Sequence, residues 1–223
     1  MAAGRVGEVM RVSVAVILAF AALSLAARAW AAVVEVKSAG AEGVPDETAT
    51  KAMAIKGIRK VERYLVIKAQ PHEVIGVDPD ARLRVLTPEG SVVEAKLESG
   101  KAFRKEDDGR NVAIVGSNVY AEDYGYRGTM GAMATMKHLL EVGQTFRLTG
   151  ESGPRLRVLG TFSAKPEALA QRVFLPLATA QKLFDRPGKL SHLFLTTEGD
   201  TEALLKELKS ALGSQLQVRV VSR

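Results

Sequence analysis

Apolar and polar residues alternate near both ends of the chain, and at each end a helix-like pattern separates two strand-like segments. Alternation with period two is typical of a strand with one buried face, whereas apolar residues three and four apart indicate a helix. The strand-like segments are residues 33–37, 60–69, 190–197 and 216–221. Each end of the chain therefore predicts a strand–helix–strand unit.

The two helices of these units are predicted from their end signals as well as from their periodicity. The first is expected to begin at Asp46 or Thr48 and to run to about Ile55. The second, residues 199–213, has the clearest helical pattern of the chain, with an N-cap candidate at Asp200 and a glycine as its last residue. Both helices are short enough to cover one face of a sheet.

Between these units, short apolar runs are separated by turn-forming residues, which is typical of strands. The runs are residues 83–86, 92–97, 112–115, 145–148 and 155–162. A further segment, residues 120–143, shows helical spacing at its end. We therefore expect an α+β fold in which residues 33–77 and 172–223 form one α/β subdomain of the βαβ type. Residues 78–171 are expected to form a β-rich subdomain inserted into it.

The stretch RVFLPLATAQKLF, residues 172–184, changes abruptly from a strand pattern to a helical pattern at Pro176. Proline has no N–H to donate to a neighbouring strand, so it favours the end of sheet pairing. Its fixed φ also suits the start of a helix. We expect this junction to mark the return of the chain from the inserted subdomain to the α/β subdomain.

Residues 1–32 have the pattern of an export signal. Arg5 and Arg11 precede an apolar run over residues 12–27, and Ala29 and Ala31 have the spacing of a cleavage site. An uncleaved membrane anchor that extends past Arg28 is the alternative reading. Both readings place the rest of the chain outside the cytoplasm, either free in the periplasm or held at the inner membrane.

The composition excludes several classes of function. The chain has 223 residues and a formal charge of +6, but its charges are mixed and aromatic residues make up only 5%. A nucleic-acid binder would show a basic stripe with aromatic platforms, so we expect no nucleic-acid partner. Cysteine is absent, which excludes disulfides, thiol catalysis and zinc–thiolate sites.

Catalytic motifs are not recognisable either, so we expect no enzymatic activity and no cofactor. The segment ESGK at residues 98–101 lacks the glycine and hydroxyl residue of a phosphate loop. The segment GESGP at residues 150–154 has proline where a nucleophile elbow has glycine. The paired carboxylates Asp107 and Asp108 fit a charged turn. The three histidines, which are far apart in the chain, are His72, His138 and His192.

A methionine-rich segment is the one candidate for a metal site. Met130, Met133 and Met136 are three residues apart, and His138 follows them. Thioethers bind Cu(I), so a copper site is one reading. The spacing also places the methionines on one face of a helix, where they would pack or contact a partner. We favour packing or partner contact.

Five segments in consistent order resemble the periplasmic core domain of MacB/FtsX-like ABC-transporter permeases. The first segment is AIKGIRKVERYLVI, with Gly57 and Val61, and the second is VIGVDP, residues 74–79. The third is the run that contains Gly100, Phe103, Asp108, Gly116 and Ala121. The fourth is a hairpin with Gly143 and Gly160, and the fifth is VFLPLATAQKLF, residues 173–184. The resemblance covers nearly everything after the N-terminal segment.

The resemblance implies a non-enzymatic domain that contacts a substrate or partner and couples this contact to an ATPase across the membrane. The implied partners are the membrane subunit of an ABC permease and, through it, the ATPase. The junction at Pro176 is the expected hinge-point, so the partner-contact candidates are Pro176, Leu177, Leu183 and Phe184.

Two alternatives remain open: a free-standing periplasmic binding protein, with copper as one possible ligand, and an exported hydrolase. Full permeases continue into further membrane helices, whereas this sequence stops at Arg223. We therefore expect part of a split permease, a free-standing relative or a truncated copy.

Overall fold

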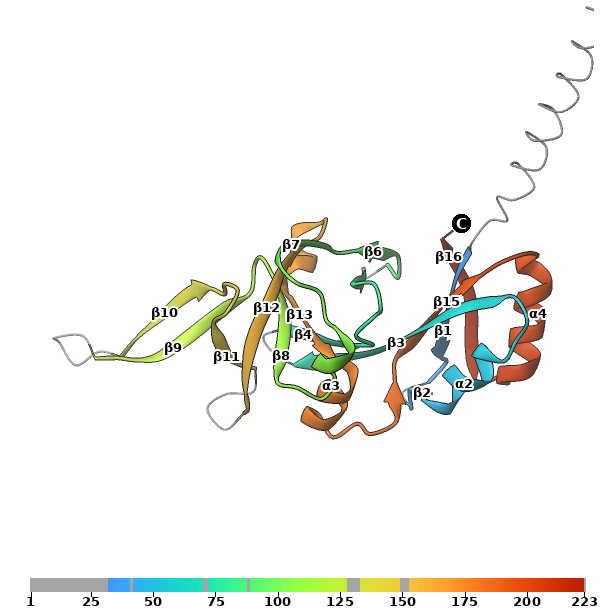
Figure 1. The fold of residues 1–223 in the computed structure, drawn as a ribbon, viewed down its shortest axis with the longest axis horizontal. Helices are drawn as coiled ribbons and strands as arrows, with labels where there is room; N and C mark the ends of the chain where they lie inside the picture. Colours follow the sequence, from blue (N-terminus) through green and yellow to red (C-terminus); the bar gives the residue numbers. More distant parts are fainter. Residues whose placement is uncertain are drawn as a thin grey trace, which may run out of the picture.

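A ten-stranded sheet forms the body of the molecule in the computed structural model, which describes residues 32–40, 42–69, 72–87, 89–127, 133–148 and 153–222. Figure 1 shows this sheet running along the long axis of the molecule. In spatial order its strands are β11 (Thr145–Arg147), β12 (Arg155–Ser163), β8 (Val112–Gly116), β13 (Arg172–Pro176), β4 (His72–Val77), β3 (Ile58–Ala69), β15 (His192–Thr197), β1 (Ala32–Ser38) and β16 (Leu216–Ser222). The tenth strand, β7 (Lys96–Gly100), pairs with β12.

The two ends of the chain lie side by side in this sheet. β1 pairs antiparallel with β15 on one side and with β16 on the other, and β15 pairs antiparallel with β3. The four strands predicted at the chain ends are therefore confirmed, apart from small differences at their ends. The mixed α/β architecture with few helices is confirmed as well.

The division into two subdomains stays a prediction. Its expected boundaries, after residue 77 and before residue 172, fall at the end of β4 and the start of β13, and these two strands pair parallel with each other in the middle of the sheet. Each face of the sheet carries one hydrophobic core that continues past this point. The strands on both sides of the boundary are thus joined by backbone hydrogen bonds and by shared cores.

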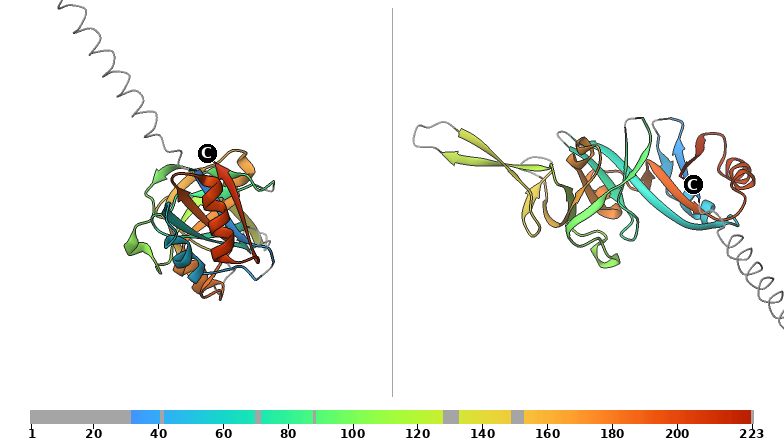
Figure 2. Two further views of the ribbon diagram at one scale, coloured as in Figure 1. Left: turned by 90° about the vertical axis from the view of Figure 1, so that its right-hand side faces the viewer. Right: turned by 90° about the horizontal axis from the view of Figure 1, so that it is seen from above.

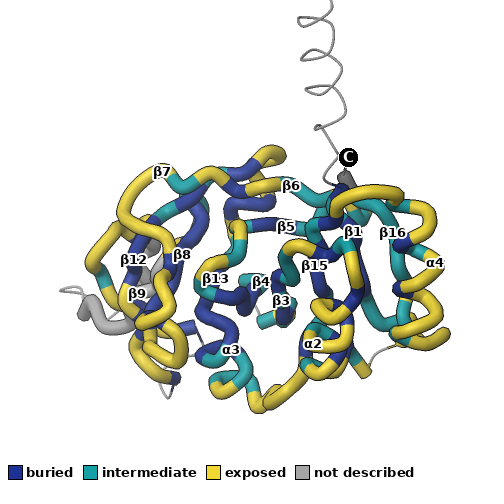
Figure 3. Tube along the Cα trace, turned by 45° about the vertical axis from the view of Figure 1, so that its right-hand side comes forward, coloured by how far each residue is buried: buried dark blue, intermediate teal, exposed yellow. Residues whose placement is uncertain are grey.

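Alternating residues of the central strands supply the two cores. In β13, Val173 and Leu175 join one core, and Phe174 joins the other. Figure 3 shows the resulting pattern, in which buried positions follow the strands while the helices expose their outer sides. A period of two with both faces apolar explains why this strand reads as an unbroken hydrophobic run.

Three helices cover one face of the sheet, and a hairpin closes the other. Residues of the helices join the first core, and these helices are α2 (Glu47–Met53), α3 (Leu177–Leu183) and α4 (Thr201–Leu212). Residues of the antiparallel pair β5 (Arg84–Leu86) and β6 (Val92–Glu94) join the second core. Minor elements are η1 (Lys105–Asp107), η2 (Glu167–Gln171) and the pair β2 (Val44–Pro45) with β14 (Lys189–Leu190).

The local signals of α4 act as expected. The Asp200 carboxylate accepts hydrogen bonds from the backbone N–H groups of Glu202, at 2.9 Å, and Ala203, at 3.3 Å. These bonds satisfy two of the donors that a helix start leaves unpaired. Gly213 follows the helix with a φ of 88°, a conformation that favours glycine. Leu204 and Leu208 bury the inner side of the helix.

The expectation of a helix after residue 130 is wrong. Residues 133–139 form strand β10 (Met133–Leu139), which pairs antiparallel with β9 (Tyr120–Arg127). Pairing with a distant segment overrides the local periodicity, so the helical face that was to carry three methionines does not form. The hairpin of β9 and β10 projects from the body of the molecule, as the right-hand view of Figure 2 shows.

Candidate functional site

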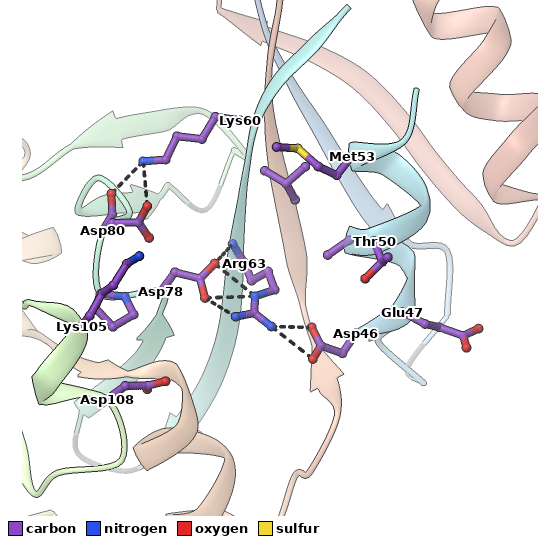
Figure 4. Close-up of a pocket in the computed structure, with 13 residues that line it drawn as sticks. Asp46, Glu47, Thr50, Met53, Lys60, Arg63, Asp78, Asp80, Lys105 and Asp108 are labelled. Carbon is purple, nitrogen blue, oxygen red and sulfur yellow. Dashed lines mark hydrogen bonds and ion pairs between the residues drawn. The ribbon is translucent and has the colours of Figure 1, made fainter. Parts of the chain in front are cut away.

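A cleft of about 850 Å³ opens on the helix-covered face, between α2 and the turn that contains η1. Figure 4 shows Thr50 and Met53 of α2 on one side and Lys105 and Asp108 on the other. The middle of β3, which is partly exposed there, lies between them and contributes Arg63 to the lining. The cleft therefore lies where the helical cover of the sheet is interrupted.

Arg63 is the centre of this cleft. Its Nε and Nη2 atoms donate to Oδ1 of Asp78 at 3.0 and 2.7 Å, and its backbone N–H donates to Oδ2 of Asp78 at 2.9 Å. Its Nη1 atom donates to both carboxylate oxygens of Asp46, at 3.0 and 3.2 Å. One guanidinium thus joins β3, the segment after β4 and the segment before α2. A planar fork of this kind holds two carboxylates in a fixed geometry.

The electrostatics keep Arg63 charged. The hydrogen bond with Asp78 raises the pKa of Arg63 above its ordinary value, and this effect outweighs the opposing effect of burial. The charge of Asp78 and the hydrogen bond with Asp46 act in the same direction. The guanidinium therefore stays protonated and crosslinks two carboxylates as a permanent cation, so it does not serve as a general acid.

Glu62, the neighbour of Arg63 on β3, anchors the same segment on the opposite face of the sheet. Its carboxylate is buried and forms a close ion pair with buried Arg84. It also accepts from the backbone N–H of Arg82 at 3.2 Å and from Nζ of Lys60 at 3.0 Å. Lys60 in turn donates to the carbonyl oxygen of Asp80 at 2.7 Å.

These contacts define a β3 hub, which we use as the name for Lys60, Glu62 and Arg63 with their partners in residues 78–84. Residues 78–84 lead from β4 into the β-rich middle of the chain. Consecutive residues of β3 point to opposite faces, so Arg63 holds this segment from the cleft face and Glu62 holds it from the other. The segment is therefore attached on both faces of the sheet.

A second buried charge cluster lies near the chain ends. Glu35 of β1 is fully buried, Oε1 of Glu35 lies 2.8 Å from Nδ1 of His192, and its other oxygen forms a close ion pair with Arg219 of β16. Arg219 also donates to the carbonyl oxygen of Gly90 at 2.6 Å, which attaches the β5–β6 turn. Burial would raise the pKa of Glu35, but the hydrogen bonds and charges of His192 and Arg219 lower it.

The residues predicted for partner contact take two different positions. Pro176 is the last residue of β13 and Leu177 the first of α3, and both are buried. Leu183 and Phe184, at the other end of α3, are half-buried. A partner can reach the second pair directly, whereas it reaches the first pair only through a movement of α3. The assignment of these residues to partner contact stays a prediction.

Close packing of α3 on the sheet explains the burial of its first turn. A Cβ atom placed on Gly76 of β4 would lie 2.6 Å from Cβ of Ala180 in α3. Only glycine at this position lets the helix approach so closely. The carboxylate of Asp108 accepts from the backbone N–H of Ala178 at 3.2 Å, which links the η1 turn to the first turn of α3.

The remaining predicted candidates do not come together in the described part of the chain. Met130 lies outside the described residues, and Met133, Met136 and His138 belong to β10. Asp107 accepts from the backbone N–H of Arg104 at 2.9 Å and so stabilises its own turn. Within the described residues, no three His, Asp or Glu side chains gather in a way that would hold a metal ion. The hypothesis that these methionines and His138 bind copper therefore stays a prediction.

Sequence reasoning missed the β3 hub. The partners Arg63 and Asp78 are 15 residues apart, and Glu62 and Arg84 are 22 residues apart. No motif links residues at such separations. The only available signal was the run of charged residues within a strand pattern, KVER at residues 60–63, because a charge inside a predicted strand needs a partner.

Among the described residues, no helix has the length and apolar character needed to cross a bilayer. Solved structures that share the fold include the following two. The periplasmic region of MacB from Actinobacillus actinomycetemcomitans has a TM-score of 0.55 at 11% identity, and the match covers 85% of this chain and 88% of that chain. The extracellular domain of YknZ, a noncanonic ABC-type transporter from Gram-positive bacteria, has a TM-score of 0.51 at 12% identity, with coverage of 84% and 99%.

A comparison with curated proteins found no match. The model of the MacB-like periplasmic core domain, by contrast, matches residues 12–211, which is most of the chain. The match includes the β3 hub, the Pro176 junction and the projecting hairpin. The protein therefore belongs to the family of MacB-like periplasmic core domains.

Proposed function

We propose that this protein is a non-enzymatic, exported part of an ABC-type transport system, and that it couples contact with a substrate or partner to an ATPase across the membrane. The family match over residues 12–211 carries the proposal. The match begins at residue 12, so it includes the apolar run that we interpret as an export signal or membrane anchor.

The position of the chain ends supports attachment to a membrane at a single place. Val33 at the start of β1 is in register with Ser222 at the end of β16. The two ends of the described domain therefore lie side by side, near the point marked for the C-terminus in Figure 1. A domain that is tethered at one such place is free to change its orientation relative to the membrane.

The proposed coupling uses the region around α3. This helix packs on β4 and β3, in the middle of the sheet, and follows β13 directly through Pro176. We propose that residues 33–77 and 172–223 move as one subdomain and residues 78–171 as another. A partner that contacts Leu183 and Phe184 would then bias the position of α3, because relative movement of packed elements transmits such a signal.

Affinity purification from native membranes tests this proposal. A tag at Arg223 is expected to recover the membrane subunit of an ABC permease or its ATPase under mild detergent. A matched chain with Leu183→Ser and Phe184→Ser changes two half-buried residues at the C-terminal end of α3. It is expected to recover less of the partner while it remains folded by circular dichroism.

Recovery of neither subunit, together with normal function in a strain that lacks every neighbouring transporter gene, would contradict the proposal. That result would instead support the alternative of a free-standing binding protein. Titration of the purified chain with Cu(I) then decides whether copper is its ligand.

A further inference from the structure

The end of the sheet formed by β11 and β12 carries an unusual set of charges. Residues of the β11–β12 pair alternate between buried and exposed positions, and three of the exposed ones are Arg147, Arg155 and Arg157. Arg147 and Arg155 are directly opposite each other in the antiparallel register. Like charges in directly opposite positions destabilise a sheet. We call these three residues the arginine face.

Nothing within the described residues neutralises the arginine face. Arg147 donates to the carbonyl oxygen of Gly153, and none of the three arginines forms an ion pair with another residue that the structure describes. In the β3 hub, by contrast, every guanidinium has a carboxylate partner. A pair of opposed arginines that has no carboxylate partner among the described residues is explained if a partner protein supplies the anion. Arginine is the side chain best suited to bind a carboxylate through two hydrogen bonds.

Exposed apolar residues gather at the same end of the sheet. Among the described residues, four large hydrophobic side chains are exposed, and three of them are Tyr120, Leu139 and Val142. Tyr120 and Leu139 are opposite each other where the β9–β10 hairpin leaves the body, and Val142 lies in the segment between β10 and β11. We call these three residues the apolar patch.

The apolar patch adjoins the arginine face through the backbone. The N–H of Gly143, next to Val142, donates to the carbonyl oxygen of Val158 at 2.9 Å, and Val158 follows Arg157 in β12. Tyrosine and arginine are enriched in protein–protein interfaces, where they dominate binding energy.

We propose that the arginine face and the apolar patch together form the docking surface for a partner protein that presents carboxylates beside an apolar spot. The arginines bind the carboxylates, and Tyr120, Leu139 and Val142 contact the apolar spot. A lipid surface fits less well, because β11 and β16 are at opposite ends of the strand order, roughly 40 Å apart at the usual strand spacing. The two ends of the described domain lie in β1 and β16, which pair with each other.

The test uses the purified full chain and a short synthetic Glu-rich peptide that carries leucines, with a Lys-rich peptide of equal length as the control ligand. The chain is expected to bind the acidic peptide at low salt and to release it as salt increases. Arg155→Glu with Arg157→Glu is expected to weaken this binding at least about tenfold. The matched control, Lys206→Glu with Lys209→Glu, makes the same charge change on exposed positions of α4 and is expected to leave binding unchanged.

A stability measurement separates loss of binding from loss of folding. Arg155→Glu replaces a like-charged pair with an oppositely charged pair across from Arg147, so it is expected to raise the melting temperature by about 1–3 °C while it weakens binding. A merely structural role of Arg155 would lower stability and binding together.

Three results would overturn the proposal. One is equal peptide binding by the natural chain and the Arg155→Glu, Arg157→Glu variant, and another is no peptide binding at low salt. The third is binding to phosphatidylglycerol–phosphatidylethanolamine vesicles that these substitutions abolish, without peptide binding, which would assign the surface to lipid. None of these results depends on a permease or ATPase, so the proposed function can stand when this inference fails.

Discussion

The β3 hub and the β11–β12 end of the sheet carry similar numbers of arginines and use them in opposite ways. In the hub, Arg63 holds two carboxylates and Arg84 holds one, and Arg84 and its partner Glu62 are buried. At the β11–β12 end, Arg147 and Arg155 are exposed and opposed to each other, and neither forms an ion pair within the described part of the chain. Paired, buried charges fix the chain in place, whereas unpaired, exposed charges are available to a partner. The comparison therefore separates residues that hold the fold from residues that offer a surface.

The largest effect is expected where the hub loses its buried carboxylate. Glu62→Ala leaves Arg84 buried without a counter-charge, so the free energy of unfolding should fall by about 3–5 kcal/mol. Urea denaturation measures this change. The double variant Glu62→Leu, Arg84→Met removes both charges and should recover most of the loss. A single variant as stable as the natural chain would show that the hub does not hold the fold.

A smaller loss is expected from Gly76→Ala, which tests how closely α3 packs beside the hub. The new methyl group would lie 2.6 Å from Cβ of Ala180, so overpacking should lower the free energy of unfolding by about 1–3 kcal/mol. In a double-mutant cycle with Ala180→Gly, the two changes should partly compensate each other. Strict additivity would mean that α3 has room to move away from β4.

The charge cluster near the chain ends should respond to pH. The pKa of Glu35 in the folded protein lies below its ordinary value of 4.5, so the cluster stabilises the fold above that pH and loses its contribution as the pH falls through the folded pKa. Arg219→Gln should lower the free energy of unfolding by about 1–2 kcal/mol at neutral pH, because Arg219 is partly exposed. Thermal melts should show this difference shrinking below pH 4.5. A constant difference would contradict the assigned ion pair.

The smallest effect on stability is expected in the apolar patch. Leu139→Ser changes a side chain that is 48% exposed, so the free energy of unfolding should change by less than about 0.5 kcal/mol. Leu65→Ser in β3, which is 5% exposed, serves as the matched control and should destabilise strongly. Equal losses in the two variants would remove the distinction between the two regions.

Features that depend on neighbouring residues were predictable from the sequence, whereas the side-chain contacts that depend on the register between paired strands were not. Alternation in residues 33–37 and the Asp200 cap act locally, so β1 and α4 form as expected. The methionine spacing after residue 130 was also a local signal, but pairing of β10 with β9 overrides it. The Arg63–Asp78 contact arises only because β3 and β4 pair, and no pattern in the sequence predicts the register between these two strands.

The Pro176 junction illustrates the same limit. Its strand-to-helix change was predicted from proline chemistry, and β13 and α3 form on either side of it. The burial of Pro176 and Leu177 was not predicted, because it depends on Gly76 in a strand about a hundred residues earlier in the chain.

The position of the domain relative to the membrane is the most direct test of the account, because a part that couples contact outside the cell to an ATPase inside must lie outside the cytoplasm. The chain contains no cysteine, so Lys209→Cys in exposed α4 introduces a single reactive thiol. We predict that a membrane-impermeant maleimide labels this thiol as fully in intact cells as in permeabilised cells, while a cytoplasmic control protein stays unlabelled. Labelling only after permeabilisation would contradict the account.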